Sequence, residues 1–185
     1  DDRLTAALPL ARQDEIGILA RSFRDMRVQI NQQMAELETR RGELEHLAQH
    51  DYLTGLPNRA LFADRVELAL ANARRSRSRL ALLFIDLDQF KPINDTRGHA
   101  VGDQLLKCLA DRIRNAIRES DTAARIGGDE FVVLLQEVRE TADVFAVADK
   151  IRRAIAMPCQ INGEDTSVSA SIGVAFFPEH GSALT

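Results

Sequence analysis

The chain has 185 residues, of which 45% are hydrophobic and 28% charged, and its formal net charge is −4 at pH 7. This size and apolar content suffice for one domain with a full core plus an additional element. The negative net charge argues against broad electrostatic binding of a nucleic acid polymer, although it is compatible with a single bound nucleotide.

Residues 14–49 predict one long amphipathic helix. The segment contains no proline, and its apolar residues recur at steps of three and four. Such a heptad seam is typical of a dimeric coiled coil, in which a second helix buries it. The seam comprises Ile16, Leu19, Phe23, Met26, Ile30, Met34, Leu37, Arg41, Leu44 and Ala48. Consecutive steps of four around Ile30 break its phase, as a stutter would. A lone amphipathic helix folded back on the domain is the open alternative.

Helices and strands alternate after residue 50. Asn58 can cap a helix with an apolar stripe, and a continuous apolar run over residues 80–85 predicts a strand covered on both faces. A second helix is followed by a hairpin with arms at residues 122–126 and 131–135. The apolar positions of the two helices are Phe62, Val66, Ala69 and Ala73, and then Leu105, Leu109, Ile113 and Ile117.

The last third of the chain predicts a helix and a further hairpin. The helix carries Val144, Val147, Ile151 and Ile155 and ends before Pro158. Residues 159–162 and 166–177 predict the hairpin, which turns at Asn162-Gly163. In its second arm, apolar residues at every second position from Val168 to Phe176 alternate with Ser167, Ser169 and Ser171. The order helix, strand, helix, hairpin, helix, hairpin predicts an α/β fold. We expect a ferredoxin-like βαββαβ-type core in which helices flank a mixed sheet.

The chain contains two cysteines, Cys108 and Cys159, which lie far apart in the sequence. Their spacing matches no arrangement of metal ligands. We therefore interpret both as small buried hydrophobic residues in a reducing compartment.

A hairpin with two glycines is the most informative local feature. The segment from Arg125 to Phe131 has the sequence Arg-Ile-Gly-Gly-Asp-Glu-Phe. A tight turn would present Asp129 and Glu130 at its tip, with no side chain at the glycines to obstruct a ligand. This arrangement suits a metal-assisted site for a large phosphorylated substrate. An ordinary Gly-Asp turn is the alternative.

Two further acids, Asp86 and Asp88, follow the predicted central strand. Carboxylates at the end of a buried strand are costly unless they are paired, hydrogen-bonded or bound to a metal. If this strand neighbours the hairpin, Asp86 and Asp129 lie side by side and supply oxygen ligands for Mg²⁺. For Asp88, a functional role and capping of the next helix remain equally open.

Residues 89–103 connect this strand to the next helix and carry groups suited to a nucleotide. Backbone N–H groups of a strand-to-helix turn can hold phosphate, and Lys91 adds a positive charge. Asn94 and Asp103 can converge on one guanine base, since a carboxylate accepts from its N–H groups and an amide pairs with its acceptors. Both residues can instead cap helices.

Arg118 and Asp121 lie three residues apart, just upstream of the second strand. From spacing alone, a surface ion pair that contributes little is the favoured interpretation. The alternative is recognition of a guanine edge, with a bidentate arginine and an accepting aspartate.

Taken together, these segments resemble the GGDEF family of diguanylate cyclases over residues 49 to about 181. Four motifs carry the resemblance, in the order Asp51–Arg59, Phe84–Lys91, Asn94–Asp103 and Gly127–Phe131. The resemblance implies the condensation of two GTP into cyclic di-GMP and two pyrophosphates. It also implies Mg²⁺ (or Mn²⁺) held by Asp86, the Leu87 main-chain carbonyl and Asp129, with Glu130 helping to hold a second metal.

The resemblance assigns further roles to single residues. Asn94 and Asp103 read guanine, and His99 shapes that pocket. Lys91 stabilises charge on the phosphates in the transition state, and family accounts place a catalytic base at Asp129. Arg118 and Asp121 match the RxxD product-inhibition site, which reverses the preference for a plain ion pair. Catalytic roles therefore fall on Asp129, Glu130 and Lys91.

Three segments are expected in the chain. Residues 1–30 form a partial HAMP-like segment, residues 31–49 a coiled-coil linker helix, and residues 50–185 a GGDEF domain that lacks its last helix. No apolar run is long enough to span a bilayer, and no signal peptide is visible. The opening Asp-Asp-Arg indicates a fragment. Because HAMP modules usually follow a membrane helix, we expect the cytoplasmic part of a bacterial inner-membrane protein, anchored by segments outside this chain.

The expected partners are GTP, cyclic di-GMP and a second copy of the chain. Two alternatives to the cyclase remain open. One is a catalytically inactive GGDEF domain that senses GTP or cyclic di-GMP, for instance within a GGDEF-EAL tandem protein. The other is a structural segment in which residues 1–48 serve dimerisation and signal transmission.

Overall fold

The structure is a computed structural model that describes residues 14–181, with the side chains of residues 43–46 excepted. The first thirteen residues of the predicted HAMP-like segment and the last four of the predicted GGDEF domain therefore lie outside the described residues. The chain divides into two units, Asp1–Ala48 and Gln49–Thr185.

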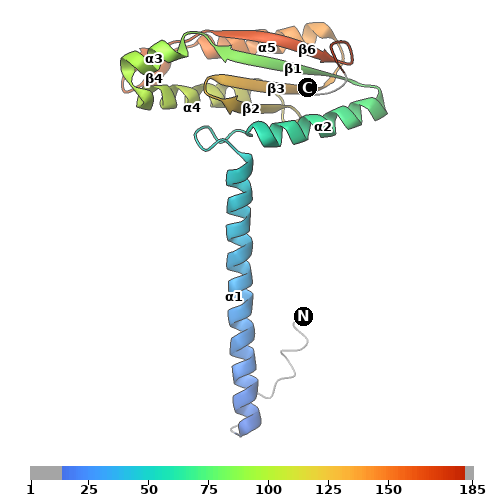
Figure 1. Ribbon diagram of the computed structural model, residues 1–185, viewed down its shortest axis with the longest axis vertical. Helices are drawn as coiled ribbons and strands as arrows, with labels where there is room; N and C mark the ends of the chain where they lie inside the picture. The colour runs from blue at the N-terminus through green and yellow to red at the C-terminus, as the bar shows by residue number, and fades with distance from the viewer. Residues whose placement is uncertain (1–13, 182–185) are drawn as a thin grey trace. The chain divides into compact units, whose positions relative to one another are not determined.

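The first unit is dominated by one helix, α1 (Glu15–Gln49), drawn in blue in Figure 1. Its 35 residues correspond to a length of about 50 Å. Asp14 caps it, because its carboxylate accepts from the Gly17 N–H at 3.1 Å. The apolar seam is exposed along its whole described length, from Ile16 at 51% to Leu37 at 64%. Among the described residues, no helix combines the length and apolar character needed to cross a membrane.

The second unit contains a four-stranded sheet with the order β2-β3-β1-β6. The strands are β1 (Arg79–Leu87), β2 (Thr122–Gly127), β3 (Glu130–Val138) and β6 (Ala170–Phe177). The α/β class and the ferredoxin-like strand order are as predicted. The expected mixed sheet is wrong, because all three strand pairings are antiparallel. Each crossover joins two parallel strands, but a third strand lies between them, so parallel strands are never neighbours.

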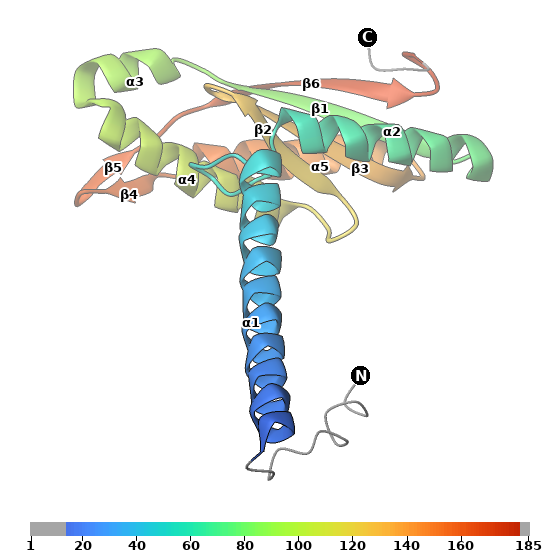
Figure 2. The ribbon, with the colours of Figure 1, turned by 60° about the horizontal axis from the view of Figure 1, so that its bottom comes forward.

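Helices cover the two faces of this sheet unequally (Figure 2). The large core joins one face to α4 (His99–Ala116) and α5 (Thr141–Ala156). A smaller core joins the other face to α2 (Arg59–Ser76). As predicted, Asn58 caps α2 through a bond from the Leu61 N–H at 3.1 Å, and the predicted stripe of α2 is buried.

The prediction that the central strand is covered on both faces holds only for its first half. Leu80 and Leu82 pack against the α2 cluster, whereas Phe84 is 48% exposed and Asp86 is exposed. Beyond Leu82, the face that α2 covers is therefore open. A short helix that the sequence did not predict, α3 (Phe90–Arg97), follows β1 directly.

The second predicted hairpin is shorter than expected. It consists of β4 (Cys159–Ile161) and β5 (Glu164–Thr166), and it turns at Asn162-Gly163, where both φ angles are positive. Residues 170–177 are not its second arm but the separate strand β6, which pairs with β1. The alternating pattern identified the strand correctly and could not identify its partner.

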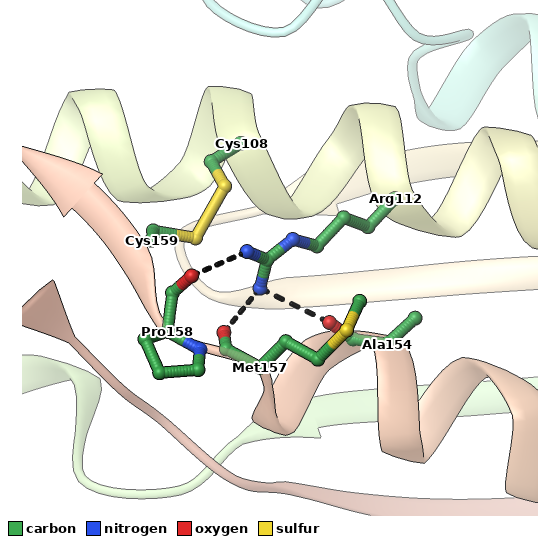
Figure 3. The surroundings of a disulfide bond; sticks show 6 residues. All are labelled: Cys108, Arg112, Ala154, Met157, Pro158 and Cys159. Carbon is green, nitrogen blue, oxygen red and sulfur yellow. Dashed lines mark hydrogen bonds between the residues drawn. A yellow bond between two sulfur atoms is a disulfide. The ribbon is translucent and has the colours of Figure 1, made fainter.

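The interpretation of the cysteines as unpaired residues is wrong. Cys108 on α4 and Cys159 at the start of β4 form a disulfide, with their Cα atoms 6.6 Å apart (Figure 3). Arg112, one turn further along α4, donates to the carbonyl oxygens of Ala154 (3.0 Å), Pro158 (2.7 Å) and Met157. A separation of 51 residues gives no sign of this pairing, because only the tertiary fold brings α4 and β4 together.

Candidate functional site

The hairpin between β2 and β3 has the predicted glycine turn at its tip. Gly127 and Gly128 have φ values of 154° and 50°, and a Cβ atom at either position would meet no neighbouring atom. The glycines therefore allow the positive φ angles of the turn and leave open space around it. Asp129 lies in this turn, and Glu130 is the first residue of β3.

Two carboxylates face each other across the central strand pair. Asp86 on β1 is the register partner of Glu130 on β3, and both line a hollow of about 360 Å³. The hollow is also lined by Phe84, Ile126, Phe131, Ser171, Ile172 and Gly173. The sequence placed Asp129 beside Asp86, whereas the residue directly opposite Asp86 is Glu130, and Asp129 adjoins it in the turn. Like charges opposite each other destabilise a sheet unless a cation lies between them.

In the part of the chain that the structure describes, these acids have no protein partner that would neutralise them. Within residues 14–181, no ion pair or side-chain hydrogen bond engages the carboxylates of Asp86, Asp129 or Glu130. No group of three or more His, Cys, Asp or Glu side chains converges in metal-ligand geometry among the described residues. The facing pair Asp86 and Glu130 nevertheless fits Mg²⁺, which commonly takes one or two carboxylates and completes its shell with water and substrate phosphates.

Asp88 is neither a free acid nor a helix cap. Its carboxylate accepts from the hydroxyls of Ser169 (2.6 Å) and Ser171 (2.8 Å), and its N–H donates to the Ser169 carbonyl at 2.9 Å. The two serine hydroxyls lower the pKa of Asp88. Neither serine was singled out from the sequence, although both belong to the polar side of the alternating pattern in residues 167–171.

The residues predicted to read a base come from two consecutive helices. Asn94 is on α3, and His99 and Asp103 are on α4. A Cβ atom on Gly102 would lie 1.9 Å from the Asn94 amide oxygen. The Asn94 side chain therefore lies directly against α4, at the residue before Asp103. The N-cap residue of α4 is Gly98, so neither Asn94 nor Asp103 has the capping role that was the alternative for them.

The remaining predicted groups are exposed. Lys91 lies in the first turn of α3, and His99 is the first residue of α4. Both are exposed, as is Asp103, so all three are accessible to a ligand.

The surface ion pair between Arg118 and Asp121 that spacing alone favoured, and that the family resemblance argued against, does not form among the described residues. Asp121 accepts instead from two backbone N–H groups, those of Arg118 (3.1 Å) and Gln136 (3.2 Å). Asp121 thus closes the turn before β2 and ties it to β3. The guanidinium of Arg118 has no ion pair among the described residues and lines a cavity of about 320 Å³ with Asp121 and Arg139. The positively charged Arg118 side chain is therefore available to a ligand in the cavity that the fixed Asp121 carboxylate also lines.

An ion pair that the sequence did not predict braces the glycine turn. Arg125 Nη1 contacts both carboxylate oxygens of Asp51, at 3.0 and 3.1 Å. Its Nε and Nη2 donate to the Gly128 carbonyl, at 2.9 and 2.7 Å. The side chains of Arg125 and Asp51 are only 10% and 16% exposed. Burial alone would raise the pKa of Asp51, but hydrogen bonds from Thr54 and Arg125 outweigh burial and lower it.

Comparison with known proteins identifies the family of this domain. The sequence profile of the family described as "Diguanylate cyclase, GGDEF domain" matches residues 48–185. The chain belongs to the GGDEF diguanylate cyclase family. It is 44% identical over 174 residues to the diguanylate cyclase TpbB of Pseudomonas aeruginosa, an alignment that covers 94% of this chain and 40% of TpbB. The chain therefore spans about two-fifths of the length of that curated relative.

Solved structures of GGDEF proteins share the fold. The isolated GGDEF domain of TpbB superimposes with a TM-score of 0.71 at 49% identity, covering 72% of this chain and 78% of that structure. The coiled coil and GGDEF domain of DgcB from Caulobacter crescentus, in complex with c-di-GMP, gives a TM-score of 0.70 at 28% identity. That match covers 82% of each chain. The Gly127–Phe131 segment thus lies within a GGDEF domain in both sequence and fold.

Proposed function

We propose that this chain carries the catalytic domain of a diguanylate cyclase, which condenses two GTP into cyclic di-GMP and two pyrophosphates. One observation carries the proposal. Asp86 and Glu130 face each other across β1 and β3, with no cationic partner among residues 14–181, next to an intact Gly-Gly-Asp-Glu-Phe turn. A domain that retains every acid of the signature in this arrangement is suited to catalysis rather than to sensing alone.

The carboxylates would hold the cation that the reaction needs. Asp86, the Leu87 main-chain carbonyl and Asp129 would form one ligand set, and Glu130 would help to hold a second ion, Mg²⁺ or Mn²⁺. When bound, the ion supplies Lewis-acid stabilisation of the phosphates and lowers the pKa of the attacking hydroxyl. Arg125 would keep the turn in place through the Gly128 carbonyl. Asp129 as a catalytic base belongs to the same proposal.

Guanine would be read at the junction of α3 and α4. The Asn94 amide is fixed against Gly102, and Asp103 follows on the exposed side of α4. An amide and a carboxylate together match the acceptors and donors of a guanine edge. His99 would shape the pocket, and Lys91 in the first turn of α3 would stabilise charge on the phosphates.

The reaction would require two copies of the domain. Each domain would hold one GTP, and the 3′-hydroxyl of one must attack the α-phosphorus of the other in line. The exposed seam of α1, with Leu19 at 70% and Met34 at 55%, supports a coiled-coil dimer that raises the local concentration of the second domain. The HAMP-like segment, the linker helix and a parent protein anchored in the inner membrane belong to this proposal.

Arg118 and Asp121 would form an inhibitory site for the product. The Arg118 guanidinium is available for a bidentate contact, and Asp121 is fixed beside it by two backbone N–H groups. Cyclic di-GMP offers phosphate and guanine edges that suit this pair. Binding there would provide feedback inhibition.

Incubation with GTP and Mg²⁺, with nucleotides separated by chromatography, tests the proposal. We expect cyclic di-GMP from the wild-type chain and none from Asp129→Ala, which should remain folded by circular dichroism. Arg118→Ala should make cyclic di-GMP and lose inhibition by added product. Bound GTP without any product would instead identify a sensing domain. If Asp129→Ala matched the wild type in every activity, the role would be structural.

A further inference from the structure

Three hydrogen bonds join the end of β1 to the start of β6. The Asp88 carboxylate accepts from Ser169 Oγ at 2.6 Å and from Ser171 Oγ at 2.8 Å. The Asp88 N–H donates to the Ser169 carbonyl at 2.9 Å. Asp88 directly follows Leu87, whose carbonyl belongs to the ligand set proposed above. The two strands are thus tied together at the edge of the site.

The backbone bond sets the direction of the Leu87 carbonyl. The N–H of Asp88 and the C=O of Leu87 belong to one planar trans peptide group, so they point in opposite directions. Because the N–H is bonded to Ser169 on the β6 side, the carbonyl points to the other side of β1. That side is the side of β3, since β1 lies between β6 and β3, and Asp129 immediately precedes β3. The carbonyl is therefore directed toward the glycine hairpin.

The side-chain bonds leave Asp86 free. Ser171 is the register partner of Asp86 across β1 and β6, and both residues line the same hollow. A serine hydroxyl at that position would be a natural donor to the Asp86 carboxylate. Asp88 accepts from this hydroxyl at 2.8 Å, so Ser171 does not donate to Asp86, and no other side chain among the described residues does so. Its open side faces Glu130.

We propose that Asp88 is a positioning residue for the cation and triphosphate site, acting together with Ser169 and Ser171. Its backbone N–H orients the Leu87 carbonyl through Ser169. Its carboxylate holds Ser169 in place for that bond and keeps the Ser171 hydroxyl away from Asp86. Asp88 does not contact the cation or the substrate itself. This inference rests on the proposed function. Groups that hold metal ligands in place typically change metal affinity about 10- to 100-fold when they are removed.

Calorimetry on the full chain tests the proposal. The probe is a GTP analogue that cannot be cleaved between its α- and β-phosphates, titrated at increasing Mg²⁺ concentrations. In Asp88→Ala, we expect the half-saturating Mg²⁺ concentration to rise about tenfold. At saturating Mg²⁺, the KM for GTP should change less than threefold, while kcat falls. Asp88→Asn, which can still pair with the serine hydroxyls, should recover part of the loss.

A second variant breaks the same contacts from the other strand. Ser169→Ala combined with Ser171→Ala leaves Asp88 in place and should raise the half-saturating Mg²⁺ concentration in the same direction. The matched control is Asp149→Ala, since Asp149 on α5 is also an aspartate held by side-chain hydrogen bonds, here from arginines. Its Mg²⁺ dependence should equal that of the wild type.

The possible outcomes separate the two proposals. If the wild type binds the analogue without Mg²⁺ dependence and makes no cyclic product, the proposed function fails. If the wild type depends on Mg²⁺ and the serine double variant shows the same dependence, the role of Asp88 is overturned. A folded Asp88→Ala with wild-type Mg²⁺ dependence would overturn it equally.

Discussion

The glycine turn of the β2–β3 hairpin is held by one set of polar groups and presents another, and the two sets are built in opposite ways. On the supporting side, Arg125 makes four hydrogen bonds, two to Asp51 and two to the Gly128 carbonyl, and it is almost buried. At the tip, Asp129 and Glu130 have no protein partner among the described residues. The polar groups that hold the turn are thus satisfied by the protein. The acids left without a partner among the described residues are those expected to meet a ligand.

We expect the largest effect on activity from neutralising one of the acids that have no protein partner among the described residues. Asp86→Asn removes a proposed cation ligand and also the like-charge pair with Glu130. We expect cyclic di-GMP synthesis to fall roughly a thousandfold, because a bound metal contributes several kcal/mol to the transition state. The thermal unfolding midpoint should be unchanged or higher, since a repulsive pair is removed. Lower stability together with lost activity would mean that Asp86 has a structural role, and calorimetry measures this.

Reduction of the disulfide should destabilise the domain. For a closed loop of 51 residues, the chain-entropy estimate is about 4 kcal/mol. Urea unfolding of the wild type with and without dithiothreitol measures the loss of stability. In Cys108→Ser, the reductant should have no effect. Equal wild-type curves under both conditions would contradict a stabilising cross-link.

Removal of the Arg125–Asp51 ion pair that supports the glycine turn should cost stability and activity together. Arg125→Ala leaves Asp51 largely buried and unpaired, which costs about 3 kcal/mol. The matched control is Arg152→Ala, because Arg152 pairs with Asp149 in an exposed position. That change should cost less than about 1 kcal/mol. Chemical denaturation of both variants provides the comparison. Equal losses in the two variants would show that burial of the ion pair has no energetic weight.

A smaller effect is expected where α3 meets α4. In Gly102→Ala, the added Cβ would lie 1.9 Å from the Asn94 amide oxygen, so this side chain must move. Loss of one hydrogen bond to the base would weaken GTP binding about three- to tenfold. Fluorescent-nucleotide titration measures this. Gly42→Ala in α1, where nothing lies within 4 Å, serves as the control and should leave binding unchanged. Unchanged binding in Gly102→Ala would exclude a role for the position of Asn94.

The smallest effect concerns pH. The pKa of Asp51 is lower in the folded protein than its ordinary value, so its contribution to stability is complete above about pH 4. The contribution is lost as the pH falls through the folded pKa. The difference in unfolding free energy between the wild type and Asp51→Asn should thus be constant from pH 5 to 7 and narrow below pH 4. Urea curves at several pH values test this, and a constant difference down to pH 3 would contradict it.

Local patterns in the sequence predicted most of the helices and strands. The cap at Asn58, the stripe of α2 and the glycine hairpin each depend on residues close together in the chain, and each was confirmed. The partner of residues 170–177, the antiparallel sheet and the disulfide depend on which distant segments meet. Periodicity gives the faces of a strand but not its neighbours, so these three features could not be predicted.

The same distinction applies to the candidate site. The sequence indicated the acids and placed Asp86 beside the hairpin. The glycine motif and the end of the predicted central strand are enough to make both predictions. It did not indicate that Glu130, rather than Asp129, lies opposite Asp86, since register depends on the exact residue at which β3 begins. Arg125 with Asp51, and Asp88 with its two serines, were missed because each set joins residues from separate segments.

The position of β1 and β3 at the centre of the sheet has a consequence for folding. Asp86 and Glu130 are brought together only when these two strands pair, and all of α3, α4 and β2 lie between them in the chain. Such non-local pairing forms late and slowly compared with local helices. A chain in which β1 and β3 have not yet paired therefore does not hold these two carboxylates together, so the facing pair is a property of the assembled sheet and not of any local segment.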